Sequence, residues 1–244
     1  MKIRIRFSKT GNLRYIGHLD LMRTFQKAIA RADLPVRFSE GFHPHPMMSF
    51  ASPLSVGETS LGEYMDTELT VPLTGQEILS RLNSALPAEI RCLSIRQLPD
   101  DEKKKNNNAM AIFGRAVYEV RLRAPYDALP AGTDISAVIA AYRSQPERIL
   151  VKKTKRNESR TDILPYIYHL AFDHGAFILC LNAGSQVNLK PEVVMEDLFR
   201  FAAIPGTELL YDADILRDLR FLITRLDMLT ADGISLSETG RKLP

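Results

Sequence analysis

The sequence lacks most of the features that assign a function class at a glance. Its only two cysteines, Cys92 and Cys180, are isolated and lack the spacing of a zinc or redox motif. No apolar run approaches the roughly 20 residues of a membrane-spanning helix. The net charge is only +3, so the overall composition gives no case for binding nucleic acid. These absences predict a cytoplasmic protein that binds no membrane and needs no cofactor.

What the chain does have is the composition of an ordinary globular protein. Apolar residues make up 45% of its 244 residues and charged residues 25%. This length allows one large domain or two small ones, each with its own core. The chain opens with a charged, alternating segment at residues 2–7, so no signal peptide is expected.

Residue periodicity in residues 1–98 predicts the order strand, helix, two strands, helix, strand. Residues 2–7 alternate strictly, so a strand there has one apolar face and one basic face formed by Lys2, Arg4 and Arg6. The following helix, over residues 18–33, has a single apolar stripe. A second helix begins after Thr74, where Thr74 and Glu77 have the spacing of a capping box.

The second half repeats this order after a polar break. Residues 99–111 have almost no apolar content and carry an Asn run, which predicts a linker. Residues 112–230 again give strand, helix, two strands, helix and strand, and residues 231–244 have the composition of a polar tail. The expected fold is therefore α+β: two tandem ferredoxin-like (βαββαβ) units with antiparallel sheets. Both helices of such a unit cover one sheet face, which leaves the other face free.

The most constrained stretch is residues 37–57, with the sequence RFSEGFHPHPMMSFASPLSVG. Gly41 permits a positive φ angle, while Pro44 and Pro46 fix φ and hold the residues before them extended. His43 and His45 are therefore expected in a stiff corner between strands. A simple strand turn needs only a glycine or an Asn-Gly pair, so this much rigidity around two ionisable rings indicates a site.

Basic residues cluster in two parts of the chain. Residues 1–40 carry nine Lys or Arg against three acids, and residues 148–160 carry six against Glu158 alone. Such clusters displace counterions from phosphate, and an open sheet face is a common place for single-stranded RNA. Long basic side chains can also simply solvate exposed faces, which is what we expect for Arg23, Lys27 and Arg31. The residues predicted to contact RNA are Arg4, Arg6, Arg37, His43, His45, Lys152, Lys153, Lys155, Arg156 and Arg160.

The histidines allow two further hypotheses. His18, Asp20, His43 and His45 are of metal-ligand types, although a structural metal site normally needs four ligands in a fixed geometry. His43 or His45 could instead act as a general base in metal-free RNA cleavage, with a neighbouring Lys or Arg stabilising the transition state. Against both, histidines beside prolines are often turn residues, and His18 near a helix start is as well explained by capping or packing.

Residues 4–69 resemble a known family. The matching motifs are Phe-x-Lys-x-Gly at residues 7–11, His-Leu-Asp at 18–20, Arg-Ala-x-Leu-Pro at 31–35, Gly-Phe-x-Pro-x-Pro at 41–46 and Ser-x-Gly-Glu-Tyr at 60–64. They are similar to those of the bacterial radical-SAM-linked protein family, a domain of unknown function that occurs alone or on the C-terminal side of a radical SAM protein. A thinner match covers residues 155–165. The Cys-x3-Cys-x2-Cys motif of radical SAM enzymes is absent from this chain, so the resemblance implies the stand-alone domain with a radical SAM enzyme as its partner.

Together these observations predict an RNA-associated accessory domain, without catalytic activity of its own, that presents tRNA or rRNA to a radical SAM enzyme. A metal-independent ribonuclease or hydrolase that uses His43 and His45 is one alternative, and a protein-binding scaffold without RNA contact is another. If the two halves are related by an approximate two-fold axis, one basic cleft would be formed by both of them. Its members would be Arg37, His43, His45, Lys153, Lys155, Arg156 and Arg160.

Overall fold

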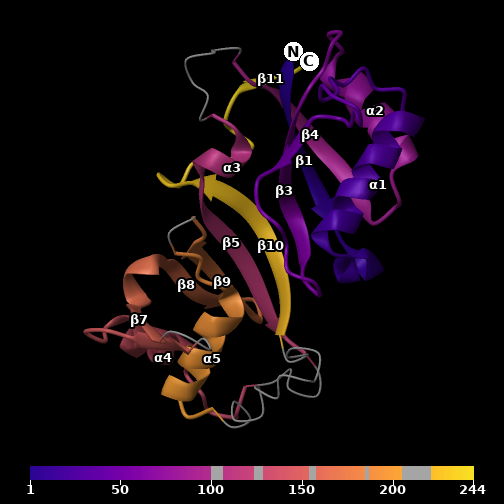
Figure 1. Ribbon diagram of the computed structural model, residues 1–244. Helices are drawn as coiled ribbons and strands as arrows, with labels where there is room; N and C mark the ends of the chain where they lie inside the picture. Colours follow the sequence, from indigo (N-terminus) through magenta and orange to yellow (C-terminus); the bar gives the residue numbers. More distant parts are fainter. Residues whose placement is uncertain (100–106, 124–128, 154–157, 185–186, 205–220) are drawn as a thin grey trace. The chain divides into compact units, whose positions relative to one another are not determined.

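The computed structural model describes residues 1–99, 107–123, 129–153, 158–184, 187–204 and 221–244, and for residues 152, 153, 158 and 159 it describes the backbone alone. The chain divides into two compact units, which can be followed along the chain in Figure 1. Unit 1 comprises Met1–Arg115 and Thr224–Pro244, and unit 2 comprises Ala116–Ile223. The division falls inside two strands, β5 (Phe113–Leu122) and β10 (Phe221–Thr230). The first unit predicted from the sequence, residues 1–98, therefore omits residues 99–115 and 224–244, which also belong to unit 1.

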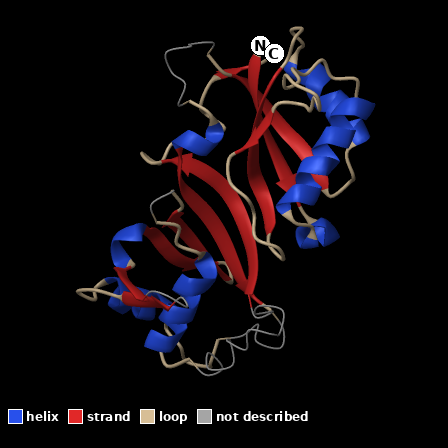
Figure 2. Cartoon of the chain, in the orientation of Figure 1, coloured by secondary structure: helices blue, strands red, loops and turns tan. Residues whose placement is uncertain are grey.

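Unit 1 is an α+β unit built on a mostly antiparallel sheet (Figures 1 and 2). Its other elements are β1 (Lys2–Lys9), η1 (Gly11–Tyr15), α1 (His18–Arg31), β2 (Met48–Phe50), β3 (Thr59–Glu68), α2 (Gly75–Ala85), β4 (Ile90–Gln97), α3 (Ala109–Ile112) and β11 (Arg241–Lys242). The strand order is β11-β4-β1-β3-β10, and β2 also pairs with β3. β1 is antiparallel to both β3 and β4, whereas β10 runs parallel to β3.

The apolar faces predicted from periodicity form the core of unit 1. The apolar face of β1 is fully buried against the stripe of α1, where the ring centroids of Phe7 and Phe25 lie 4.8 Å apart. α2 begins with the predicted capping box: Thr74 accepts from the Glu77 N–H, and the Glu77 carboxylate accepts from the Thr74 N–H. Both helices lie on the same side of the sheet (Figures 1 and 2). The predictions of α1 with its buried stripe and of the capping box that begins α2 are confirmed.

The opposite face of β1 is not the free basic surface that the alternation predicted. Arg4 is only 1% exposed and forms a bidentate salt bridge with Asp66, with N–O distances of 2.7 and 2.8 Å. Asp66 also accepts from the Ala109 N–H at 2.7 Å, and Arg4 donates to the Asn107 carbonyl at 3.1 Å and to the Thr239 hydroxyl. The segments that carry these groups, α3 with its N-cap region and the chain after β10, therefore cover this face.

Two segments predicted to be irregular are ordered parts of unit 1. α3 begins within the predicted linker at residues 99–111, of which residues 100–106 lie outside the described residues. The predicted polar tail, residues 231–244, buries Leu236 completely and pairs with β4 through β11. The polar composition of the tail did not reveal this order. The burial of a single leucine side chain stabilises the folded state by about 1.5–3 kcal/mol, even when its sequence neighbours are polar.

Unit 1 is completed by β10, which packs along β3. Glu63 of β3 forms a bidentate salt bridge with Arg225 of β10, with N–O distances of 2.7 and 2.8 Å between two buried side chains. The Ser60 hydroxyl donates to the Arg225 carbonyl at 3.0 Å. A Cβ atom at Gly62 would lie 2.5 Å from the Leu226 carbonyl oxygen, so this close approach of two strands requires glycine. The Ser-x-Gly-Glu-Tyr motif is therefore explained by the contact between β3 and β10.

Unit 2 combines a small antiparallel sheet with a separate two-stranded hairpin. Its elements are α4 (Ile135–Arg143), β6 (Ile149–Lys153), β7 (Glu158–Asp162), η2 (Leu164–Tyr166), β8 (Ile167–Asp173), β9 (Ala176–Asn182) and α5 (Pro191–Phe201), together with most of β5. β9 pairs with β5 and with β8, and β6 pairs with β7. Arg148, just before β6, forms a bidentate salt bridge with Asp197 at 2.6 and 2.9 Å. Its guanidinium also lies over the rings of Tyr142 and Phe201, so the base of the β6–β7 hairpin is tied to α4 and α5.

The helices in the described residues are short. α1, with 14 residues, is the longest of them. None of the described helices has both the length and the apolar character that crossing a membrane requires.

Candidate nucleic-acid interface

Residues 37–47 form a hairpin, called here the 37–47 hairpin, that is attached at its base to β3. The Arg37 N–H donates to the Glu68 carbonyl at 2.7 Å. The two arms are joined by a hydrogen bond from the Ser39 N–H to the His45 carbonyl at 2.9 Å. The prolines predicted to stiffen this segment therefore lie in a hairpin that backbone hydrogen bonds also hold.

The tip of the 37–47 hairpin presents aromatic and apolar side chains to solvent. Gly41 has φ of 115°, a conformation that favours glycine. Phe42 follows it and is 101% exposed, and Phe38 and Met47 on the two arms are also exposed. A fully exposed phenylalanine forgoes about 1.5–3 kcal/mol of burial energy. Because exposed apolar side chains that gather in one place usually mark interaction sites, the hairpin tip is a candidate interface.

The two histidines of the 37–47 hairpin are exposed, and one of them helps to close it. His45 Nδ1 lies 2.9 Å from the Ser39 hydroxyl, which also accepts from the His45 N–H at 3.1 Å. No carboxylate in the described part of the chain forms a hydrogen bond or ion pair with the His43 or His45 ring. The geometry therefore gives both rings solvent access but does not assemble the nucleophile, base and orienting group of a hydrolase.

The first-half arginines predicted to contact RNA occupy three different environments. Arg37 is exposed, and its guanidinium lies 3.3 Å from the Glu68 carboxylate. Arg6 is half-buried and donates to the Leu226 carbonyl at 3.3 Å. Arg4 is buried in its salt bridge. Of these three, Arg37 alone is placed at the surface beside the 37–47 hairpin.

The second-half cations belong to the β6–β7 hairpin of unit 2. Lys152 and Lys153 lie in β6, but their side chains are outside the described part of the structure, as are residues Lys155 and Arg156 altogether. Arg160 lies in β7, opposite Val151, and is exposed. The predicted cleft that would join these cations to the 37–47 hairpin stays a prediction.

The proposed metal ligands His18, Asp20, His43 and His45 are not gathered into a site. The His18 ring packs edge-on against Phe50, with centroids 5.4 Å apart, and Asp20 pairs with an arginine one turn further along α1. Among the residues that the structure describes, no three His, Cys, Asp or Glu side chains are placed to hold a metal ion. The arrangement gives the metal hypothesis no support.

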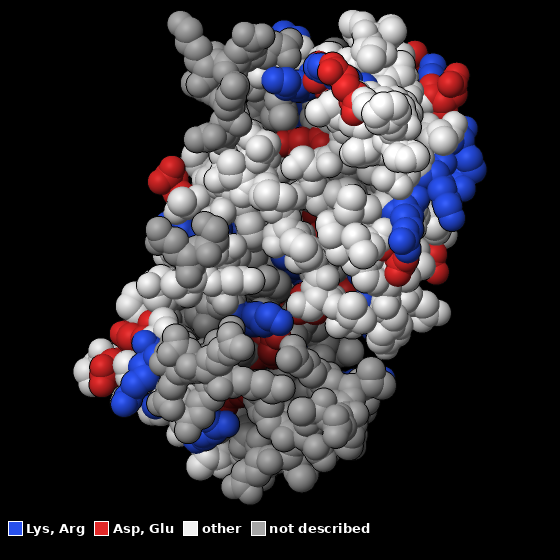
Figure 3. Space-filling view, in the orientation of Figure 1, with Lys and Arg blue, Asp and Glu red and all other residues white. Residues whose placement is uncertain are grey.

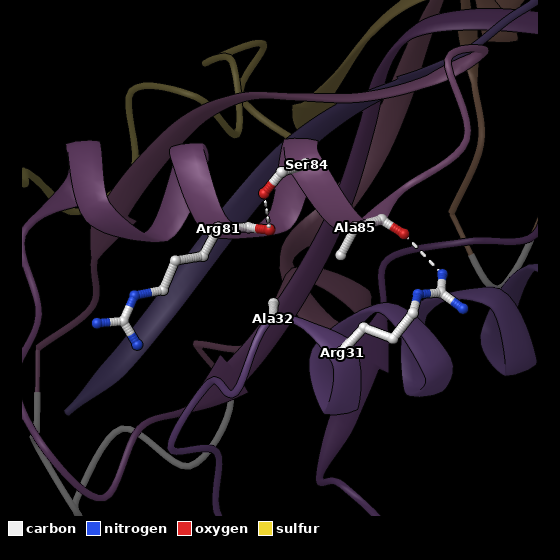
Figure 4. Close-up of a pocket in the computed structure, with 5 residues that line it drawn as sticks. All are labelled: Arg31, Ala32, Arg81, Ser84 and Ala85. Atoms are coloured by element: carbon white, nitrogen blue, oxygen red, sulfur yellow. Dashed lines mark hydrogen bonds between the residues drawn. The ribbon is translucent and has the colours of Figure 1, made fainter.

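Lys and Arg side chains also gather over α1, as Figure 3 shows. α1 carries Arg23, Lys27 and Arg31. Near the C-terminal end of α1 there is an open pocket of about 290 Å³ (Figure 4). The residues that line it are Arg31, Ala32, Arg81, Ser84 and Ala85. Arg31 of α1 donates to the Ala85 carbonyl at 2.6 Å, and Arg81 of α2 donates to the Asp33 carbonyl at 3.3 Å. Each arginine therefore satisfies a carbonyl at the C-terminal end of the other helix. Helix capping explains this pocket without a ligand.

The sequence predictions missed η1, which follows β1. Lys9, the last residue of β1, is buried, and its Nζ donates to the carbonyls of Ile16 at 3.0 Å and Arg14 at 3.4 Å. Burial lowers the pKa of Lys9 from its ordinary value of 10.5, and nearby carboxylates act in the opposite direction. The Arg14 guanidinium lies over the ring of Tyr15. One feature of the sequence could have pointed to η1: an arginine next to a tyrosine in a glycine-containing loop. A count of charges along the chain does not distinguish this arginine from the others.

Comparison with known proteins gives a family but no activity. The model of a family described as an uncharacterized protein conserved in bacteria (DUF2344) matches residues 2–191. No curated protein is found to match the chain. The family match runs from the start of β1 to the first residue of α5, and so includes the 37–47 hairpin, η1 and the β6–β7 hairpin. The chain therefore belongs to this family of uncharacterized bacterial proteins.

Proposed function

We propose that the protein binds single-stranded RNA through the 37–47 hairpin and acts as an accessory protein without catalytic activity of its own. The main support is the Phe42 ring, which is fully exposed on a hairpin held by backbone hydrogen bonds. Unpaired bases stack on exposed aromatic rings, and each stacked base contributes about 1–3 kcal/mol. His43 and His45 add two exposed rings that both stack and form hydrogen bonds.

Basic residues supply the phosphate contacts of this proposal. Arg37 is exposed beside the hairpin, and residues 148–160 carry six Lys or Arg against one acid. Contacts of this kind bind any sequence and release counterions from the RNA. Arg4 has no place among them because it is buried. The proposed phosphate contacts of unit 2 are Lys152, Lys153, Lys155, Arg156 and Arg160.

We also propose that both units are variants of the ferredoxin-like unit. In unit 1 the antiparallel order β4-β1-β3, with β2 on the far side of β3, supports this, as do α1 and α2 in their places along the chain. In unit 2 the succession β5, α4, β8, β9, α5 has the same order as the first five elements of such a unit, provided that the β6–β7 hairpin is an insertion. The sixth element would be β10, of which residues 221–223 belong to unit 2 and the rest to unit 1.

The proposed partner of the protein is a radical SAM enzyme, to which it would present tRNA or rRNA. This part rests on the resemblance of residues 4–69 to the radical-SAM-linked family and on the absence of a cysteine cluster from the chain. A domain that holds RNA without transforming it needs a separate enzyme to act on the bound strand.

Fluorescence anisotropy with a labelled oligouridylate of about 12 nucleotides tests the RNA proposal on the full-length protein. Phe42→Ala should weaken binding about 5- to 100-fold, because the stacking of one base is lost. Val71→Ala is the matched control: it truncates another exposed apolar side chain of unit 1, at 54% exposure, and should leave the affinity unchanged.

Three outcomes would contradict this proposal in different ways. Equal affinities of the Phe42→Ala and Val71→Ala proteins would remove the hairpin from the interface. RNA fragments that appear with the wild-type protein and vanish with His43→Ala would favour a nuclease. Complete lack of RNA binding at low salt would leave a protein-binding scaffold as the better explanation.

A further inference from the structure

η1 lies at the opposite end of β1 from the 37–47 hairpin. The hairpin is attached at Glu68, which pairs with Lys2, whereas η1 follows Lys9 at the other end of the strand. At about 3.3 Å per residue, the two ends of β1 are roughly 23 Å apart. A ligand group bound at η1 therefore meets a different surface from one bound at the hairpin tip.

Arg14 of η1 is a cation without a carboxylate partner among the described residues. Among the described residues, no group forms a hydrogen bond or ion pair with its guanidinium, and its Nε atom is buried without an acceptor. The guanidinium lies over the Tyr15 ring, 4.8 Å from the ring centroid. Because the described residues supply no acceptor to this guanidinium, its N–H donors are not engaged by the protein, and guanidinium donors bind anionic oxygens through charge-assisted hydrogen bonds.

Tyr15 is one of three exposed apolar side chains in and next to η1, a group called here the Tyr15 patch. Its own exposure is 52%, that of Leu19 is 64% and that of Val56 is 62%. The Gly57 N–H donates to the Arg14 carbonyl at 2.9 Å, which brings the loop before β3 against η1. The Tyr15 patch therefore combines a half-exposed aromatic ring, two exposed apolar side chains and a cation that has no carboxylate partner in the described part of the chain.

The buried Lys9 side chain fixes the backbone on both sides of Tyr15 through hydrogen bonds. Its two hydrogen bonds, to the carbonyls of Arg14 and Ile16, lie on either side of Tyr15 in the sequence. They fix the backbone that carries both the cation and the ring. Binding groups that are fixed beforehand lose less conformational entropy when a ligand arrives.

We propose that Arg14 and Tyr15 form a nucleotide-binding site for single-stranded RNA. A base stacks on the ring face opposite the guanidinium, and Arg14 binds an adjacent phosphate. Aromatic rings and guanidinium planes are common partners of unstacked bases, and guanidinium groups bind phosphate oxygens through charge-assisted hydrogen bonds. This inference rests on the proposed function and adds a second contact, which strengthens binding because one RNA chain links the two sites.

Salt-dependent RNA affinities of full-length variants test the two roles separately. Tyr15→Ala should weaken oligouridylate binding about 5- to 100-fold at every salt concentration, since stacking is not ionic. Tyr15→Phe keeps the ring and should bind like the wild type. Arg14→Gln should both weaken binding and reduce the steepness of log K against log salt by about 0.7, the value for one phosphate on a single strand. Leu93→Ala, which truncates an exposed apolar side chain on β4, should change nothing.

Photo-crosslinking with oligouridylate that contains 5-iodouracil locates the contact directly. We expect a crosslink at Tyr15, identified by mass spectrometry of the digested protein. Wild-type affinity of Tyr15→Ala and Arg14→Gln, together with weak binding of Phe42→Ala, would overturn this site and leave the hairpin proposal standing. Weak binding of the η1 variants with normal binding of Phe42→Ala would support this site and overturn the hairpin. A wild-type protein that binds no RNA would overturn both.

Discussion

Burial decides which basic residues of unit 1 can meet a ligand. Residues 1–40 carry nine Lys or Arg, yet Arg4 and Lys9 are buried and have their partners inside the unit. Arg37 is at the surface but has a carboxylate beside it. Arg14 differs from all three because, among the described residues, the partner of its guanidinium is an aromatic ring and not an acceptor group. A count of charges along the sequence could not separate these cases, since the carboxylate that neutralises Arg4 is 62 residues away.

Ionisation of Tyr64 is expected to make unit 1 less stable at alkaline pH. Burial, followed by the hydrogen bond to Asp227 and the charge of that residue, raises the pKa of Tyr64 from 10.0 to about 12. Because the pKa is higher in the folded state, this contribution to stability is fully present below pH 10 and is lost as the pH rises through about 12. We therefore expect the unfolding midpoint of the wild type to fall toward that of Tyr64→Phe across this window. A gap between the two midpoints that stays constant with pH would contradict the burial of the hydroxyl.

Local sequence signals were sufficient for most of the regular elements. The alternation of β1 and the helical stripe of α1 predicted the apolar faces that form the core, because the period of a strand or helix is visible directly in the sequence. The alternation did not predict that the basic face of β1 is covered as well. Glycine and proline predicted the stiff corner that became the 37–47 hairpin. The full exposure of Phe42 was not predictable, because an aromatic residue in a turn is as compatible with a buried position as with an exposed one.

The segment after β10 behaves as a structural element, although its composition predicted a tail. Leu236 is fully buried, whereas Ile234, two residues earlier, is 49% exposed. Leu236→Ala should therefore destabilise the protein by about 2–5 kcal/mol through loss of burial and creation of a cavity. Ile234→Ala, the matched control, should change the unfolding midpoint little. Urea unfolding of both variants measures this difference, and equal midpoints would show that the segment does not pack as described.

At the level of the whole chain, the order of elements was predictable for residues 1–98 but less so for the second half. Between α4 and α5 the sequence predicted two strands, whereas the structure has four, β6, β7, β8 and β9. The α+β class with a mostly antiparallel sheet is confirmed. The return of β10 to β3 was missed, because the buried salt bridge between Glu63 and Arg225 joins residues that are 162 positions apart. No local pattern reports a contact over that separation.

The candidate interface was predictable in part, because local sequence signals report only neighbours along the chain. The sequence identified the 37–47 hairpin through its prolines and histidines, which are neighbours along the chain. It placed Arg4 on an open sheet face because it could not show the segments that cover this face. It passed over Arg14 and Tyr15 because the buried Lys9 beneath them becomes visible only in the folded unit.

The salt dependence of RNA binding by the full-length protein tests the proposed function most directly. The affinity for an oligouridylate of about 12 nucleotides is measured by anisotropy over a range of salt concentrations. We predict that log K falls linearly with log salt with a slope of about −1.5 to −3, as expected when about two to four phosphates are neutralised. Phe42→Ala should give a parallel line of lower affinity, because the lost stacking is not ionic. Binding that is absent at low salt, or that does not change with salt, would contradict RNA contact by this protein.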